Sequence, residues 1–200
     1  MSVTLDRYRS YAKVYFDPLV AIAVRFGLTP NFFTLAAFAA SAGAGLLFYL
    51  RLEFWGIVAV ALNAFCDAMD GAVAREMKSQ SLRGDFLDHA VDRYADIFII
   101  TGIFAGGLVP WPIGVFALTG VLMASYLGTQ AQAVGVGRYY GGLLGRADRL
   151  VLIMVVGIFD LLYAVPMYGL NIFGWLFVLF GIFGHITAFQ RFAYVWRKMK

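Results

Sequence analysis

Charged residues are scarce in this 200-residue chain. They make up 14% of it, against about 25% in a typical soluble domain, whereas 62% of the residues are hydrophobic and the mean hydropathy is +0.77. This composition excludes an ordinary water-exposed surface and predicts that lipid surrounds most of the chain. The single cysteine, Cys66, excludes an intrachain disulfide and a thiolate metal cluster. The two histidines, His89 and His185, are isolated in the sequence and do not suggest a histidine metal site.

Six apolar stretches are long enough to cross a bilayer, which takes about 20 helical residues. They lie near residues 31–51, 54–76, 84–107, 110–133, 147–165 and 170–192. The sequence therefore predicts an all-α integral membrane protein with six transmembrane helices, in one domain over residues 28–200. Residues 1–27 interleave basic and apolar side chains without a continuous apolar core. This pattern excludes a signal peptide and predicts an N-terminal amphipathic helix at the membrane interface, bent near Pro18.

The basic residues predict the orientation. If the N-terminus is cytoplasmic, nearly all of them fall at the cytoplasmic ends of the predicted spans, and only Arg51 lies clearly opposite. Cytoplasmic loops of membrane proteins carry such an excess of arginine and lysine. We therefore expect a multi-pass protein of the cell membrane whose two termini both face the cytoplasm.

Four aspartates form two closely spaced pairs between apolar stretches. Asp67 and Asp70 are three residues apart, and Asp88 and Asp92 are four apart. On helices, each pair projects from one face, so two adjacent helices would direct four carboxylates at one point. Acidic residues at membrane depth are costly and usually functional, and carboxylate oxygens suit a hard cation such as Mg²⁺. The pattern thus predicts a metal site that opens toward the cytoplasm.

Two residues beside the first pair fit a phosphate ligand. Gly71 would let a ligand approach the backbone closely, and Arg75 offers a planar guanidinium fork. The alternative is two charged helix ends that pair with neighbouring basic residues. That alternative does not require the full arrangement of acids, glycine and arginine in apolar surroundings.

The complete pattern resembles the signature of a known family. Asp67-x-x-Asp70-Gly71-x-x-Ala74-Arg75, eight residues, then Gly84-x-x-x-Asp88-x-x-x-Asp92 is similar at every fixed position to the CDP-alcohol phosphotransferases, integral membrane enzymes of phospholipid synthesis. The family also tends to have a turn similar to Thr29-Pro30-Asn31 before its first span. The proline of this turn would occupy the first helical position, with Thr29 as the N-cap.

The resemblance implies roles for these residues. Asp67, Asp70 and Asp88 would hold one Mg²⁺ ion, and Asp67, Asp88 and Asp92 a second, with Mn²⁺ as an alternative metal. Asp92 would also be the general base for the acceptor hydroxyl. A CDP-linked lipid would bind against Thr29, Pro30, Asn31, Phe32, Gly71, Arg75 and Ser81. The resemblance also implies a homodimer among membrane lipids and no nucleic-acid partner.

A separate, basic motif lies at the start of the fifth predicted span. Arg146 and Arg149 share a face of its first turn, whereas arginine is electrostatically favoured in the last turn of a helix. Their position suggests a bound anion, which Arg191 near the end of the last span could help to hold. The alternative is that these residues only set the topology.

The resemblance favours inositol phosphate as the acceptor, because members that use it carry such an arginine pair and a later arginine. Those members also tend to have a basic residue near the end of the fourth span, where residues 128–132 here are uncharged. Glycerol phosphate and serine therefore stay alternative acceptors. The sequence predicts transfer of a phosphatidyl-type group, either diacylglycerol or archaeol phosphate, from a CDP-linked lipid to a small alcohol, with release of CMP.

Two other classes of protein fit less well. A cation or proton transporter could use paired carboxylates in the membrane, but its helices should then show repeat symmetry. Residues 110–200 contain no second copy of the acidic motif. A scaffolding protein would not need the spacing of Gly71 and Arg75.

Overall fold

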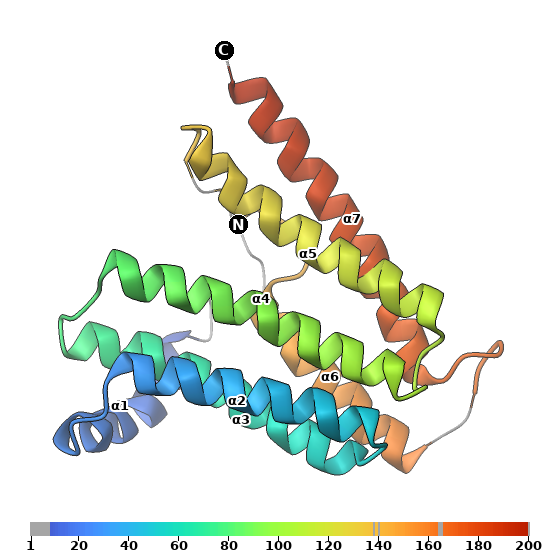
Figure 1. Ribbon diagram of the computed structural model, residues 1–200, viewed down its shortest axis with the longest axis horizontal. Coiled ribbons are helices and arrows are strands. Elements are labelled where there is room, and N and C mark those ends of the chain that lie inside the picture. The colour runs from blue at the N-terminus through green and yellow to red at the C-terminus, as the bar shows by residue number, and fades with distance from the viewer. Residues whose placement is uncertain (1–8, 138, 140, 164–165, 200) are drawn as a thin grey trace. The chain divides into compact units, whose positions relative to one another are not determined.

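Every helix or strand assigned in the described part of the chain is an α-helix. A computed structural model describes residues 9–137, 139, 141–163 and 166–199 (Figure 1). The helices are α1 (Arg9–Arg25), α2 (Pro30–Tyr49), α3 (Glu53–Glu76), α4 (Leu82–Ala105), α5 (Trp111–Ala133), α6 (Arg146–Leu162) and α7 (Ile172–Lys198). The prediction of an all-α protein is confirmed.

Helices α2 to α7 match the six predicted apolar stretches in order. Four of them, α2, α3, α5 and α7, are long and apolar enough to cross a membrane. The other two depart from that pattern for different reasons. Helix α4 is 24 residues long but carries the second pair of aspartates, and α6 has 17 residues, slightly fewer than the ~20 that a span needs.

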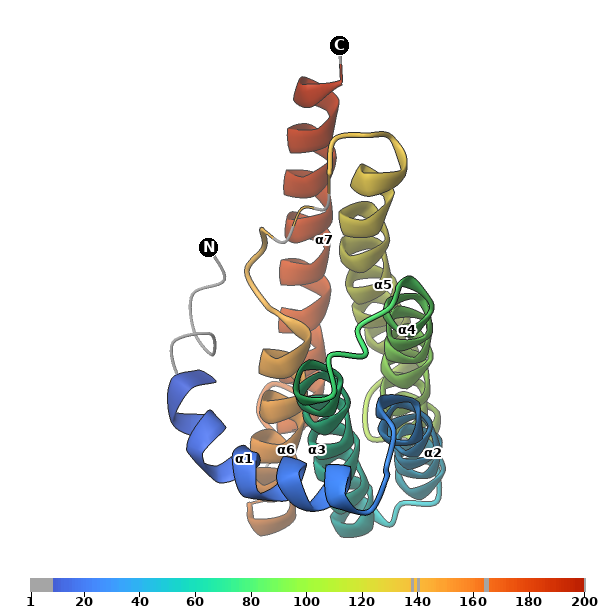
Figure 2. The ribbon, with the colours of Figure 1, turned by 90° about the vertical axis from the view of Figure 1, so that its left-hand side faces the viewer.

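The contacts divide the chain into two compact units, within Asp6–Gly102 and within Ile103–Lys200. In the first unit α2, α3 and α4 run side by side (Figures 1 and 2). The buried side chain of Asn63 on α3 donates a hydrogen bond of 2.8 Å from Nδ2 to the backbone carbonyl of Ala37 on α2. An amide buried in apolar surroundings needs such a partner, so this bond fixes how α3 lies against α2.

Helices α2 and α4 approach each other through glycines. A Cβ atom built at Gly102 on α4 would overlap the backbone of Gly45 on α2, and one built at Gly45 would lie 2.5 Å from the carbonyl oxygen of Phe98. Small residues allow membrane helices to pack at backbone contact. This contact fixes the position of α4, which carries Asp88 and Asp92.

Helix α1 crosses the end of α3 (Figure 2). Its buried side chains, Val20 and Ala23, pack with Met69 and Val73 of α3, while Ile22 and Phe26 are exposed. Pro18 lies inside this helix. One side of α1 therefore covers the helix that carries the first pair of aspartates.

The second unit is built on the pair α5 and α7, which lie side by side in both ribbon views (Figures 1 and 2). A Cβ atom at Gly184 on α7 would lie 2.5 Å from the carbonyl carbon of Gly120 on α5. Helix α6 packs against α7. The glycine contact brings the two long helices together at the level of their backbones.

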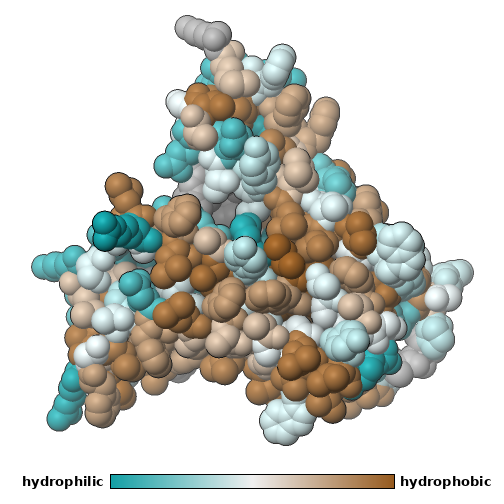
Figure 3. All heavy atoms as spheres, viewed as in Figure 1, coloured by the Kyte–Doolittle hydropathy of each residue, from teal (hydrophilic) through white to brown (hydrophobic). Residues whose placement is uncertain are grey.

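Large apolar side chains are exposed along the candidate spans. Over α2 most of the visible surface is hydrophobic (Figure 3), with Leu35 and Leu46 more than half exposed. Phe54 and Trp55 of α3 are similarly exposed. Apolar side chains on the outside are expected of helices that face lipid.

The glycine contact between α2 and α4 can be tested with an alanine. We expect Gly102→Ala to destabilise the protein by about 1–3 kcal/mol, because the added methyl group overfills a packed interface. Thermal unfolding in detergent measures the effect. Gly43→Ala on α2 is the matched control, since a Cβ there meets nothing within 4 Å, and it should leave stability unchanged or slightly raised. Equal melting temperatures for the two variants would contradict this packing.

Candidate functional site

Three aspartates from two helices converge in the first unit. Asp67 and Asp70 lie about one turn apart on α3, and Asp88 lies on α4; one carboxylate oxygen of each is within 4.8 Å of the others. Asp70 is buried, and Asp67 and Asp88 are partly exposed. The helical spacing of the two pairs predicts a meeting of all four aspartates, and three of them meet here. Three carboxylate oxygens at such distances form a set of ligands that fits a hard divalent cation.

Asp92 lies one turn beyond Asp88 on α4 and belongs to a neighbouring group. Ligand atoms of Asp88, His89 and Asp92 are within 4.8 Å of one another. The Asp92 carboxylate also lies 3.6 Å from the guanidinium of Arg93. The sequence treats His89 as isolated, but the structure places its Nε2 atom 3.2 Å from the carboxylate of Asp85. Asp85 lies one turn before His89, Asp88 directly before it and Asp92 three residues after it on the same helix. The helical spacing of these acids could have indicated the contacts from the sequence.

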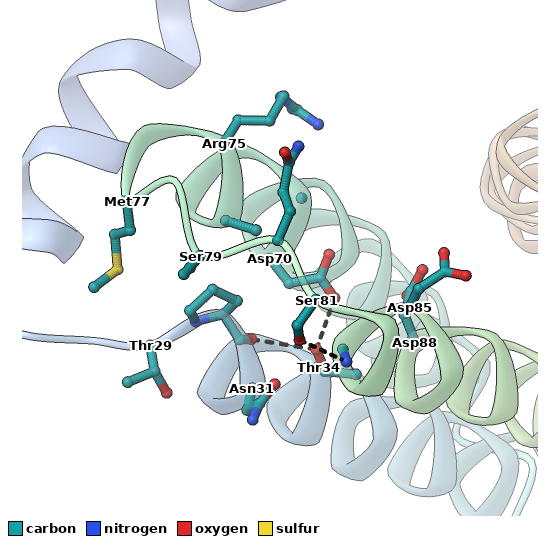
Figure 4. A pocket seen from close by; sticks show the side chains of 15 residues that line it. Thr29, Asn31, Thr34, Asp70, Arg75, Met77, Ser79, Ser81, Asp85 and Asp88 are labelled. Atoms are coloured by element: carbon teal, nitrogen blue, oxygen red, sulfur yellow. Dashed lines mark hydrogen bonds between the residues drawn. The ribbon is translucent and has the colours of Figure 1, made fainter.

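Asp70 has a partner that the sequence motifs do not include. The hydroxyl of Thr34 on α2 donates to Asp70 Oδ2 at 3.0 Å, and both side chains are buried. Figure 4 shows this bond beside Ser81. The two residues are 36 positions apart, so only the packing of α2 on α3 reveals the pair.

A cavity of about 510 Å³ opens beside Asp70 and Asp88 (Figure 4). Its lining comes from the start of α2, the end of α3, the start of α4 and the connection between α3 and α4. The lining residues are Thr29, Pro30, Asn31, Thr34, Asp70, Gly71, Ala74, Arg75, Met77, Ser79, Gln80, Ser81, Gly84, Asp85 and Asp88. Six of the seven residues that the sequence assigns to the CDP-linked lipid therefore surround one cavity.

The exception is Phe32. Its side chain is 52% exposed, and its ring meets the ring of Phe33 edge to face, with centroids 5.4 Å apart. Phe32 is not among the described residues that line the cavity. It follows directly after the Thr29-Pro30-Asn31 turn, so the sequence alone did not separate it from that turn.

The Thr29-Pro30-Asn31 turn has the predicted capping geometry. Thr29 is the N-cap of α2, and its side-chain oxygen accepts a bond of 3.3 Å from the backbone N–H of Phe32. Pro30 occupies the first position of the helix, where no N–H is needed. The cap holds the backbone of the turn in place at the edge of the cavity.

Arg75 lies in the last turn of α3, and Ser81 is the last residue of the connection between α3 and α4. A Cβ atom at Gly71 would lie 3.3 Å from Nη1 of Arg75, so the guanidinium packs over the space that a larger side chain would fill. Ser81 Oγ accepts a bond of 3.1 Å from the backbone N–H of Gly84 and thereby caps the first turn of α4. Ser81 thus has a structural role in addition to its place in the cavity.

The three arginines that the sequence assigns to an anion, Arg146, Arg149 and Arg191, lie in the second unit. Arg146 is the first residue of α6, and Arg149, one turn later, is buried. Arg149 lines a small cavity with Ala124 and Thr187. The helix start is capped by Asp148, whose Oδ2 accepts from the N–H of Gly145 at 2.9 Å.

Arg191 of α7 donates hydrogen bonds to two backbone carbonyls. Its Nε donates to Gly141 O at 2.8 Å, and its Nη1 donates to Ala124 O at 2.6 Å. Thr187, one turn before it, accepts from the N–H of Leu143 at 3.2 Å. These bonds hold the segment before α6 against α7. The sequence assigns Arg191 to an anion and gives no indication of these backbone contacts.

Comparison with known proteins relates both units to one family. The sequence profile of CDP-alcohol phosphatidyltransferases matches residues 27–189. The archaetidylinositol phosphate synthase of Pyrococcus horikoshii is 32% identical over 172 residues, which cover 86% of this chain and 91% of that protein.

Solved structures agree with the sequence comparison. The phosphatidylinositol phosphate synthase of Mycobacterium tuberculosis with CDP-DAG bound matches with a TM-score of 0.79 and 26% identity, covering 92% of this chain and 96% of that one. The same enzyme in complex with manganese and citrate also gives a TM-score of 0.79, at 26% identity over 92% of this chain and 91% of that one.

Proposed function

Because this chain belongs to the CDP-alcohol phosphatidyltransferase family, we propose that it transfers a phosphatidyl-type group from a CDP-linked lipid to inositol phosphate and releases CMP. The observation that carries the proposal is the convergence of Asp67, Asp70 and Asp88 beside a cavity edged by the Thr29 turn and Arg75. A cavity with hydroxyl, amide and guanidinium groups in its lining, next to three carboxylates, suits a nucleotide diphosphate with its metal ions. The lipid part of the donor is diacylglycerol or archaeol phosphate.

The membrane arrangement is part of the proposal. Helices α2 to α7 cross the cell membrane six times as one domain over residues 28–200. The predicted interfacial segment over residues 1–27, of which residues 1–8 lie outside the described part of the chain, lies at the cytoplasmic surface of that membrane. The four apolar spans and the basic residues at one set of helix ends support this arrangement. The active site then faces the cytoplasm, from which a nucleotide can reach it. The family resemblance also favours a homodimer.

The acidic residues fit a metal centre. Asp67, Asp70 and Asp88 would hold one Mg²⁺ or Mn²⁺ ion through hard oxygen ligands, and Asp67, Asp88 and Asp92 would hold a second. Bound metal ions supply neutralisation of the diphosphate and of the charge that develops on the CMP leaving group. The manganese complex of the mycobacterial enzyme supports a divalent cation in this family.

The chain's own residues position the two substrates. The N–H groups at the start of α2 and the guanidinium of Arg75 are suited to the diphosphate, with Gly71 and Ser81 beside them in the same cavity. Asp92 accepts the proton of the acceptor hydroxyl as that oxygen attacks the β-phosphorus atom, the one that carries the lipid. Arg146, Arg149 and Arg191 hold the phosphate of the acceptor. Glycerol phosphate and serine are the competing acceptors.

The first test is CMP release by the purified protein. We expect release that requires Mg²⁺ or Mn²⁺ and an acceptor, with the lipid product identified by mass spectrometry after inositol phosphate, glycerol phosphate and serine are offered in turn. Asp67→Asn should reduce release to background, because it removes a ligand that both proposed ions share. Asp17→Asn on α1 is the control and should keep normal release, since Asp17 is exposed and is not among the described residues that line the cavity. Near-normal turnover of Asp67→Asn would contradict the two-ion arrangement.

The role of Asp92 can be separated from metal binding. We expect Asp92→Asn to keep substantial affinity for the CDP-linked lipid, because Asp67, Asp70 and Asp88 stay in place. Its kcat should fall by about 10²–10⁴, the usual contribution of a general base. Binding of the CDP-linked lipid and single-turnover CMP release measure the two effects. A loss of donor binding as severe as that of Asp67→Asn would make Asp92 chiefly a metal ligand.

The acceptor site can be tested by a substitution that keeps the charge. Arg149→Lys should raise the KM for the acceptor by roughly tenfold to a hundredfold, because a charge-assisted hydrogen bond contributes about 1.5–3 kcal/mol and lysine lacks the planar fork. The KM for the CDP-linked lipid should hardly change. Arg197→Lys in the last turn of α7 is the control and should leave both values unchanged. If Arg149 serves topology alone, lysine will replace it without effect.

A further inference from the structure

Thr34 lies between the Thr29-Pro30-Asn31 turn and the acidic cluster. It is in the second turn of α2, only 4% exposed, and lines the large cavity. Its hydroxyl contacts Asp70 Oδ2 on α3 at 3.0 Å. Through this bond Thr34 connects α2, which begins at the Thr29 turn, to a carboxylate of the cluster.

The hydroxyl proton has two acceptors within reach. Thr34 Oγ1 lies 3.2 Å from the backbone carbonyl of Pro30, one turn earlier, and 3.0 Å from Asp70. One hydroxyl donates one proton at a time. An ionised carboxylate is the stronger acceptor, whereas a bond from threonine to the carbonyl four residues earlier adds little and slightly weakens a helix. The proton therefore goes to Asp70.

We propose that Thr34 is a positioning residue for the metal centre. By donating to Oδ2 of Asp70, it restricts rotation of the carboxylate and keeps Oδ1 for the cluster with Asp67 and Asp88. This inference rests on the proposed function, which supplies the metal. Hydrogen bonds behind a metal ligand commonly change metal affinity by about 10–100-fold.

Burial makes this bond more effective than one at a surface. Asp70 is 8% exposed, so little water can replace the threonine hydroxyl if it is removed. The carboxylate would then lose a donor and gain rotational freedom close to two other acids. Both changes favour a less defined set of ligands and weaker binding of a divalent cation.

The test uses the full-length protein in detergent and Mn²⁺ as the probe. The loss of the electron paramagnetic resonance signal of free Mn²⁺ reports binding. Thr34→Val keeps the shape of the side chain and removes the hydroxyl, so we expect its Kd for Mn²⁺ to rise by about 10–100-fold. Thr34→Ser retains the hydroxyl and should bind close to the wild type. Raising the Mn²⁺ concentration should restore much of the CMP release of Thr34→Val.

Ser41→Ala is the matched control. Ser41 is a fully buried hydroxyl residue on the same helix, and it donates to the carbonyl of Phe38 at 2.7 Å, within α2. Its removal should leave the Kd for Mn²⁺ unchanged. A fall in affinity as large as that of Thr34→Val would show that any lost hydroxyl in α2 perturbs the site, and it would overturn the positioning role.

The remaining outcomes separate this inference from the proposed function. If the wild type does not bind Mn²⁺, the proposed metal centre is wrong. If the wild type binds Mn²⁺ and Thr34→Val binds it equally well, only the role of Thr34 is overturned. Should Thr34→Val fail to give a folded, monodisperse sample, Thr34→Cys replaces it. A thiol is a weak donor, so its affinity should lie between those of the serine and valine variants, and wild-type affinity would contradict the inference.

Discussion

Repulsion among the aspartates is the constraint on which the first unit depends. Carboxylate oxygens of Asp67, Asp70 and Asp88 lie within 4.8 Å of one another, a distance at which two full like charges repel by about 3–4 kcal/mol at an effective dielectric constant of 20. Packing elsewhere must oppose this repulsion. The bond from Asn63 to Ala37 and the contact between Gly45 and Gly102 hold α3 and α4 against α2. Such an arrangement is favourable once a cation occupies the cluster, which is the physical argument for the metal.

The parts that the sequence predicted are those with a local cause. Helix positions follow from long apolar runs, the spacing of each aspartate pair follows from the helical period, and the Thr29 cap follows from a threonine before a proline. The end of α7 was less well predicted: the helix continues to Lys198, beyond the apolar run that ends near residue 192. Its last turn contains Arg197 and Lys198, which are favourable at a helix C-terminus, so it needs no apolar stretch.

The parts that the sequence could not predict depend on which helix faces meet. Thr34 and Asp70 share no motif, and nothing in the sequence couples Arg191 to the carbonyl of Ala124 on α5. Gly128, near the end of α5, has a physical explanation only in the structure. A Cβ atom at Gly128 would overlap Nη1 of Arg191 and lie 3.1 Å from the carbonyl oxygen of Tyr139, so any side chain there would displace the observed guanidinium. The glycine at position 128 therefore leaves room for the guanidinium of Arg191.

The polar residues of the first unit gather where three helices begin or end. The cavity is bordered by the N-terminal turns of α2 and α4 and by the C-terminal turn of α3. Two helix N-termini present partial positive charge and N–H groups to the same space, and Arg75, in the last turn of α3, opposes the partial negative charge of that helix end. An anionic diphosphate is thus favoured at the cavity although its neighbours include Asp70 and Asp88. The same carboxylates would repel the diphosphate without a bound cation, so donor binding and metal binding should be mutually dependent.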